Sequence, residues 1–329
     1  MELWDEDLTP AELTATARGV IDAIEESDVT AALLPNETAN DIRVEFDVNT
    51  SAGRRTEGTP LRSWDAESAI GGGDGAERRF AETLASSWKV RFSEYERLRR
   101  LNETSPEAVS DAVQGRIREV VDVIVNRLRS LRSEALLTGG LSINERGVVQ
   151  SVDFGRRPDF TVTASDPWDD DDADPIGDLE TWSEAFAEEN GIEPEVAVVG
   201  RRVLAAMFRS PGVAALFPQG TNITQGGVNT LLTERGLPAL VVNSNRRVLS
   251  QEHVLLAVPG SDALGSTVWG PTAESYEEGY GLEGAERPGM AVGIYTTKDP
   301  IVWWVHGAAA YLPVLKNANL SFAAQVLSD

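Results

Sequence analysis

Histidine and cysteine, which carry much of nucleophilic and metal chemistry in proteins, are nearly absent from this chain. Its 329 residues contain two histidines, His253 and His306, and no cysteine. The lack of cysteine excludes disulfides, thiolate catalysis and cysteine-ligated metals. A Ser-His-Asp triad would need a histidine beside a presented nucleophile, and the sequence has no Gly-x-Ser-x-Gly turn. We therefore expect structural roles for both histidines.

The acidic run between positions 166 and 175 is the next candidate for chemistry. Asp170, Asp172 and Asp174 alternate like the first oxygen ligands of a calcium loop, but Pro175 stands where such a loop needs glycine. Asp178 lies where a helix is expected to begin, and carboxylates favour that end of a helix. We favour a hydrated acidic loop and helix start, and keep the three alternating aspartates as weak metal candidates.

Motifs for cofactors and for acid–base catalysis are also missing. None of the three lysines, Lys89, Lys298 and Lys316, follows a glycine, so the chain has no phosphate-binding loop. The 53 acidic residues create many accidental carboxylate pairs, and nothing singles out one pair for hydrolysis. The sequence therefore predicts no catalytic residue and no cofactor.

The chain is strongly acidic, with 53 Asp and Glu against 29 Lys and Arg and a formal net charge of −24. All but three of the basic residues are arginines. So much like charge destabilises a compact protein unless cations screen it. This composition is typical of proteins from high-salt, GC-rich organisms such as halophilic archaea; an acidic protein from a merely GC-rich bacterium or its phage is the alternative.

Two groups of arginines could contact nucleic-acid phosphates, namely Arg97, Arg99 and Arg100, and then Arg127, Arg129 and Arg132. Arginine binds phosphate well, but it pairs equally well with carboxylates in so acidic a chain. The overall charge opposes strong DNA affinity. We favour salt bridges and keep Arg97, Arg99 and Arg100 as possible DNA-facing residues.

The sequence offers no signal for a membrane or for secretion. No apolar run approaches the roughly 20 residues that a membrane span requires. The acidic start lacks the basic and apolar regions of a signal peptide. We expect a soluble, intracellular protein without membrane contact.

Two helices are predicted with confidence from their ends and their apolar spacing. Thr9-Pro10-Ala11-Glu12 is a capping box with proline at the first helical position, and an apolar stripe follows. The longer helix covers 105–138, where apolar residues keep helical spacing until Gly139. It fits a helix lying on a sheet. Strand-like segments follow without a regular βαβ alternation, so the predicted class is α+β.

Two segments before the long helix have no evident support of their own. The helix after Thr9 is marginal in water by itself. Residues 41–75 alternate weakly and then become polar and rich in glycine, which indicates a long two-stranded excursion, and an isolated hairpin is barely stable. We expect both segments to rely on neighbouring subunits more than on their own core. The predicted subunit-interface residues are Leu13, Val20, Ile24, Arg54, Arg55, Arg62 and Trp64.

Several short motifs occur in an order that resembles the lambda-type major capsid protein E family of tailed viruses. The resemblance covers about residues 35–329 and is weakest at 259–288. No single motif is specific, and the order carries the weight. The motifs are Trp88-Lys-Val-Arg-Phe before the long helix, Leu136-Leu-Thr-Gly-Gly-Leu-Ser-Ile, Val152-Asp-Phe-Gly, Asp174-Pro-Ile-Gly-Asp-Leu, Lys298-Asp-Pro and Tyr311-Leu-Pro-Val-Leu.

This resemblance implies the Hong Kong 97 capsid fold. Residues 1–40 would be an N-terminal arm and 41–90 an extended loop reaching over neighbours. Residues 91–161 and 289–329 would form the peripheral domain, with 105–138 as its spine helix, and 162–288 the axial domain. Some relatives cross-link a loop lysine to a neighbour, but 42–85 contains no lysine, so we predict no such cross-link.

The implied function is a major capsid protein of the virion, assembled in the host cytoplasm as hexamers and pentamers of one chain. They would form an icosahedral head around double-stranded DNA, bound without sequence specificity. Expected partners are a separate scaffold protein, a portal and possible cement or turret proteins. An encapsulin-like compartment shell is the nearest alternative, and a halophilic carboxylate-dependent hydrolase belongs to a different class.

Overall fold

The computed structural model describes residues 9–49, 76–92, 106–220, 222–246, 248–260, 263–299 and 301–328. The chain forms two compact units, and each is built from three stretches of sequence. Unit 1 contains Met1–Val44, Phe80–Arg132 and Ser266–Val314. Unit 2 contains Glu45–Arg79, Ser133–Gly265 and Leu315–Asp329. Each unit is described by itself below.

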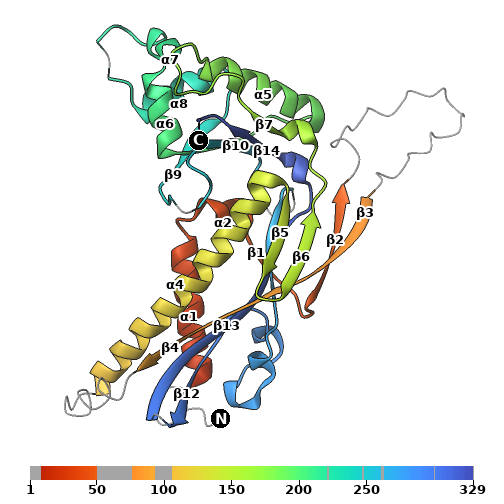
Figure 1. Cartoon of the computed structure of the whole chain (residues 1–329), viewed down its shortest axis with the longest axis vertical. Coiled ribbons are helices and arrows are strands. Elements are labelled where there is room, and N and C mark those ends of the chain that lie inside the picture. Colours follow the sequence, from red (N-terminus) through yellow and green to blue (C-terminus); the bar gives the residue numbers. More distant parts are fainter. Residues whose placement is uncertain are drawn as a thin grey trace, which may run out of the picture. The chain divides into compact units, whose positions relative to one another are not determined.

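Unit 1 is a five-stranded sheet with helices beside it (Figure 1). The strand order is β1-β11-β13-β12, and β4 pairs with the opposite side of β13. Its strands are β1 (Asn36–Thr38), β4 (Leu84–Phe92), β11 (Gly265–Gly270), β12 (Ala291–Lys298) and β13 (Ile301–Leu315). Its helices are α1 (Pro10–Glu25), α2 (Val29–Leu33) and most of α4 (Pro106–Thr138).

Helix α4 confirms the predicted long helix, and its apolar stripe is buried from Val113 to Leu131. Val120 lies against Gly307 of β13 so closely that a Cβ on this glycine would be 2.6 Å from Val120 Cγ1. Tyr311 of β13 donates its hydroxyl to the Ile124 carbonyl at 3.4 Å. The helix therefore lies on the sheet of unit 1, as its narrow stripe predicted.

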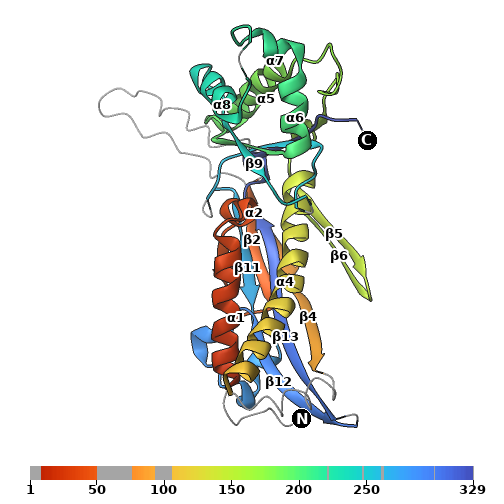
Figure 2. The ribbon, with the colours of Figure 1, turned by 90° about the vertical axis from the view of Figure 1, so that its left-hand side faces the viewer.

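Unit 2 holds a second five-stranded sheet, in the order β7-β14-β10-β8-β9. Aromatic rings fill its core, with Phe160 stacked on Phe186 at 6.1 Å and Trp182 on Phe322 at 5.9 Å. A separate hairpin, β5 (Gly140–Glu145) with β6 (Val148–Asp153), follows α4 (Figure 2). The sheet strands are β7 (Thr161–Thr163), β8 (Val196–Gly200), β9 (Ala239–Asn243), β10 (His253–Ala257) and β14 (Ser321–Gln325). The helices are α5 (Pro175–Asn190), α6 (Arg201–Arg209), α7 (Pro211–Ala215) and α8 (Gln225–Glu234).

The sequence missed several strands, and one of them, β11, contradicts a specific expectation. Residues 259–288 were expected to be loop, but they contain β11, in which all six residues are buried. Gly265-Ser-Thr-Val-Trp-Gly has only two large apolar residues and no alternation, because both of its faces are covered. The short apolar stretch expected after Lys298 is the start of the 15-residue β13.

The pairing of the last strand differs from the expected domain division. That division separates 289–329 from 162–288, whereas β14 pairs with β10 on one side and with β7 on the other. Strand β14 therefore shares a sheet with strands from 161–257. Distance along the chain could not reveal this pairing, since it joins segments about 70 and 160 residues apart.

The described parts of the arm and the excursion find packing partners within their own subunit, and the expected contacts with neighbouring subunits stay a prediction. In α1 the stripe of Leu13, Ala17 and Ile21 is buried on unit 1. The excursion is two-stranded as expected, with β2 (Arg43–Asn49) paired to β3 (Ala76–Glu82). Phe46 packs against Phe154 at 5.7 Å within unit 2. Intramolecular packing supplies the surface that the sequence did not reveal.

Candidate functional site

The arm is fastened to unit 1 by a buried polar network around Arg132 of α4. This guanidinium is fully buried, and three of its nitrogens donate to three different side chains. Nη1 donates to Glu25 Oε1 at 2.8 Å, Nη2 to Asn36 Oδ1 at 2.7 Å and Nε to Thr267 Oγ1 at 2.7 Å. The network therefore ties α4 to the end of α1, to β1 and to β11.

The remaining groups of the network are also satisfied. Asn36 donates to Glu25, and its Oδ1 also accepts from Trp269 Nε1 at 2.8 Å. The Thr267 hydroxyl in turn donates a hydrogen bond to the Leu34 carbonyl at 3.0 Å. Burial lowers the pKa of Arg132, and the Glu25 carboxylate opposes that shift. A fully satisfied buried network is rigid and specifies one arrangement of the arm.

A second arginine of α4 extends this attachment. Arg129 forms an ion pair with Asp28, and Asp28 caps α2 by accepting from Thr30 N at 2.9 Å. The preference for salt bridges over DNA contact is thus confirmed for Arg129 and Arg132. The sequence could not single out these partners, because Glu25 and Asp28 are two acidic residues among 53.

Helix α1 also bonds the outer edge of β12 at Val292. Thr14 Oγ1 accepts from Val292 N at 2.9 Å and donates to Val292 O at 3.2 Å, as a neighbouring strand would. Arg18 donates from Nε to the Met290 carbonyl at 3.0 Å. Thr14 is 1% exposed, so water does not replace it. Neither Thr14 nor Arg18 had been predicted as functional.

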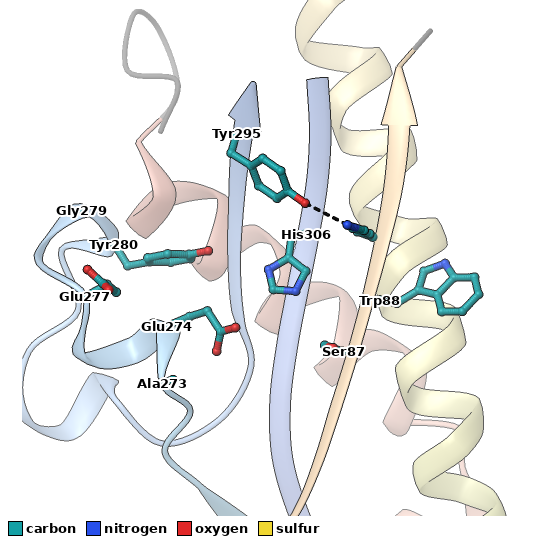
Figure 3. A pocket seen from close by; sticks show the side chains of 10 residues that line it. Ser87, Trp88, Ala273, Glu274, Glu277, Gly279, Tyr280, Tyr295 and His306 are labelled. Carbon is teal, nitrogen blue, oxygen red and sulfur yellow. Dashed lines mark hydrogen bonds between the residues drawn. The ribbon is translucent and has the colours of Figure 1, made fainter. Parts of the chain in front are cut away.

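A cavity of about 820 Å³ lies between the sheet of unit 1 and the segment after β11 (Figure 3). Lys89 of β4 donates to Tyr295 Oη at 3.3 Å, and its ammonium lies 4.7 Å from the Trp304 ring centre. His306 packs edge-on to Tyr295 at 6.4 Å. Glu274 and Tyr280 line the opposite wall.

Burial sets the protonation of this cavity. It lowers the pKa of His306; Glu274 raises that pKa and Lys89 lowers it further. It raises the pKa of Tyr280 to about 12. At neutral pH the cavity therefore holds a neutral imidazole and a neutral phenol, and its lysine is engaged in a cation–π contact. This arrangement stabilises the sheet and offers no activated nucleophile.

The weak metal candidates take separate structural positions. Asp174 Oδ1 accepts from Gly177 N at 3.1 Å and caps α5, while Asp170 and Asp172 are exposed. Asp178, the predicted helix-start residue, accepts from Trp168 Nε1 at 2.8 Å. Across the described ranges no group of three His, Asp or Glu side chains could hold a metal ion.

The predicted interface residues fall into three groups. Leu13 is 3% exposed and packs inside its own subunit, whereas Val20 and Ile24 on the same helix are half-buried. Arg54, Arg55, Arg62 and Trp64 lie outside the described residues, as do the possible DNA-facing Arg97, Arg99 and Arg100. Within the described ranges no helix is long and apolar enough to cross a membrane.

A model of the phage major capsid protein E family matches residues 45–326. The chain belongs to this family. It is a major capsid protein, and its role is structural and not enzymatic. The sequence-based expectations of family and function are thereby confirmed. No curated protein sequence matches the chain.

Solved structures show the same fold at low identity. A phage-related protein from Bordetella bronchiseptica RB50 has a TM-score of 0.63 and 16% identity, with 95% of each chain covered. The capsid protein assigned to a prophage of Escherichia coli CFT073 has a TM-score of 0.60 and 14% identity. The match covers 98% of the present chain and all of the E. coli chain. A virus-like particle protein from Pyrococcus furiosus reaches 0.53 at 12% identity, covering 95% and 99%. The α+β fold of this major capsid protein is thus the Hong Kong 97 type.

Proposed function

We propose that this major capsid protein forms hexamers and pentamers that close into an icosahedral head around double-stranded DNA. The observation that carries the proposal is the family match over 45–326. A separate scaffold, a portal and cement or turret proteins are the partners we propose.

Within the head, we assign the axial role to unit 2 and the peripheral role, with α4 as spine, to unit 1. The support is the sheet pairing, since β14 joins the strands of 161–257. Residues 50–75 carry the proposed contacts Arg54, Arg55, Arg62 and Trp64, and 93–105 the proposed DNA-facing Arg97, Arg99 and Arg100. Assembly would take place in the host cytoplasm.

Electron microscopy of the purified protein in molar salt tests the assembly. Closed shells with five- and six-fold capsomers are expected, alone or with the scaffold protein coexpressed. Discrete monomers or dimers under all of these conditions would contradict the proposal. DNA content of particles from infected cells separates a viral head from an encapsulin-like shell, which would hold protein cargo.

The acidity of the chain suggests a host that lives in concentrated salt. With a net charge of −24, lowering the salt removes the screening that opposes self-repulsion. We expect the shells to dissociate or unfold on dialysis to low salt. Particles equally stable at both ionic strengths would contradict the halophilic host.

A further inference from the structure

The cavity of about 820 Å³ in unit 1 has two walls, and these walls differ in charge. One wall is the face of the sheet that carries Lys89, Tyr295 and His306 (Figure 3). The other is the segment between β11 and β12, which carries Glu274 and Glu277. Every residue that lines the cavity lies within the described ranges and within unit 1, so the hollow is a feature of this folded unit.

The wall that carries Glu274 is held in place by a hydrogen-bonded turn. Ser275 is 1% exposed, and its hydroxyl donates to the Thr272 carbonyl at 2.7 Å. The backbone N–H of Thr272 donates back to Ser275 Oγ at 3.2 Å. Glu274 lies inside this turn, so its half-buried side chain starts from a fixed position on the cavity wall. A wall that is fixed before binding lowers the entropy lost when a ligand enters.

Tyr280 brings a polar atom into the cavity. Its side chain is 7% exposed, and its ring lies over Gly293 of β12, where a Cβ would be 2.8 Å from the phenol oxygen. Figure 3 shows the hydroxyl directed toward the sheet wall. Among the described residues this hydroxyl has no hydrogen-bond partner. Because an enclosed polar atom is unfavourable without a partner, the hydroxyl indicates a place for a polar group of a ligand.

The charges of the lining favour a positive ligand. The one ammonium group, on Lys89, is held on the sheet wall by Tyr295 and Trp304. Within the described part of the chain, neither Glu274 nor Glu277 forms an ion pair. The lining therefore contains two carboxylates and one ammonium group, which leaves it negative.

This negative potential reaches the neutral rings in the cavity. Glu274 raises the pKa of His306, and Glu274 and Glu277 both raise the pKa of Tyr280. Both shifts have the sign expected when a carboxylate acts on a nearby group. A positive group placed between these rings would therefore be stabilised by the same carboxylates.

The aromatic lining favours an organic cation over a metal ion. Tyr280 faces the cavity from one wall, and Tyr295 and His306 face it from the other. The negative faces of aromatic rings attract ammonium and guanidinium groups. Divalent metal ions need several clustered oxygen ligands, and no group of three His, Asp or Glu side chains in the described ranges could supply them.

We propose that this cavity binds a small organic cation, with an ammonium or guanidinium group on an apolar body. The cationic group donates to Glu274 and to the Tyr280 hydroxyl, and the apolar body packs on the Tyr295 ring. The proposal does not depend on assembly into shells. Failure of one would leave the other standing.

The two histidines make the site observable by NMR, since His306 lines the cavity and His253 lies in β10 of unit 2. The full-length protein in molar potassium chloride is titrated with benzylammonium at constant ionic strength. We expect a saturable shift of the His306 ring signals, with His253 unchanged as the internal control. The pKa of His306 should fall further in the complex, because a nearby positive charge opposes protonation.

Two molecules of similar shape test the role of charge. Benzyl alcohol is neutral and benzoate is negative, so both should bind about tenfold or more weakly than benzylammonium. A titration without a saturable shift at His306 would overturn the proposal. So would a benzyl alcohol affinity equal to that of the cation.

Substitutions in the segment between β11 and β12 locate the binding group. Glu274→Gln keeps the shape of the side chain and should weaken benzylammonium binding about tenfold or more. Glu283→Gln is the matched control, because Glu283 is exposed in the same segment and does not line the cavity, and its affinity should be unchanged.

Tyr280→Phe gives a second, independent variant. It keeps the ring over Gly293 and removes only the hydroxyl, so binding should weaken by about threefold to tenfold. If Glu274→Gln does not fold, this variant decides by itself. Wild-type affinity in either folded variant would contradict the proposed site.

Discussion

Two arginines, the fully buried Arg132 of unit 1 and the part-buried Arg156 of unit 2, show that the two units neutralise an enclosed positive charge in different ways. Arg132 in unit 1 faces a carboxylate, Glu25, at 2.8 Å. Arg156 in unit 2 instead donates to the last carbonyls of α4, with Leu137 O at 3.0 Å, and to Ser321 Oγ at 2.9 Å. Burial lowers the pKa of Arg156 to about 10. One site neutralises its charge with an anion, and the other with the negative end of a helix.

The difference matters when either arginine is lost. Removing Arg132 leaves the Glu25 carboxylate buried without its counter-ion, and an uncompensated buried charge is among the most destabilising defects in a protein. Removing Arg156 leaves only carbonyl groups without a donor. The sites therefore should respond unequally to the same substitution.

The largest effect is expected for Arg132→Met, which should lower the free energy of unfolding by about 3–5 kcal/mol. Chemical denaturation of the subunit in molar salt measures it. Arg118→Met on the same helix is the matched control, since Arg118 is exposed. The control should change stability by at most about 1 kcal/mol. Adding Glu25→Gln to Arg132→Met should recover part of the loss; no recovery would mean that the carboxylate is not the cause.

Arg156→Met should cost less, about 1–3 kcal/mol, because it strands no anion. The same denaturation experiment compares the two variants directly. A loss equal to or larger than that of Arg132→Met would contradict the distinction drawn between the two sites.

Substitutions of the side chains that bond the sheet edges at Val292 and Leu240 should give smaller losses of stability. Thr14→Val leaves both backbone groups of the buried edge at Val292 unpaired, with an expected loss of about 1–3 kcal/mol. Asn229 of α8 bonds the backbone N–H and C=O of Leu240 in β9. Asn229→Ala should lower the free energy of unfolding by less, because Asn229 is only partly buried and water can reach the strand. Thr16→Val is the control, since this exposed hydroxyl only bonds the Glu12 carbonyl of its own helix. Equal losses in Thr14→Val and Thr16→Val would show that the hydrogen bonds at Val292 have no energetic role.

The smallest effect concerns pH. Burial holds the pKa of folded His306 below its ordinary value of 6.5, so the unfolded chain binds the proton more readily. This contribution to stability is complete above pH 6.5 and declines as the pH falls toward the folded pKa. His306→Gln should flatten the stability profile in that window, with His253 still present. An unchanged pH profile would show that burial of His306 is not linked to stability.

The sequence by itself determined the long helix, the start of α1 and the class of protein. Thr9, Pro10 and Glu12 signal the start of α1 locally. The apolar spacing of α4 up to Leu131 is visible in the sequence without knowledge of the element it packs against. The family followed from weak motifs in order, and the missing cysteine and scarce histidine pointed away from enzymes.

Only the tertiary structure decided which residues meet. Thr14 bonds Val292 of β12, which is 278 residues away in the sequence, and Arg132 pairs with Glu25, 107 residues away. Such pairings depend on the path of the whole chain, and threonine or glutamate at one position carries no signal of its partner. For the same reason the sequence left the arm without a surface, whereas α1 packs on its own subunit.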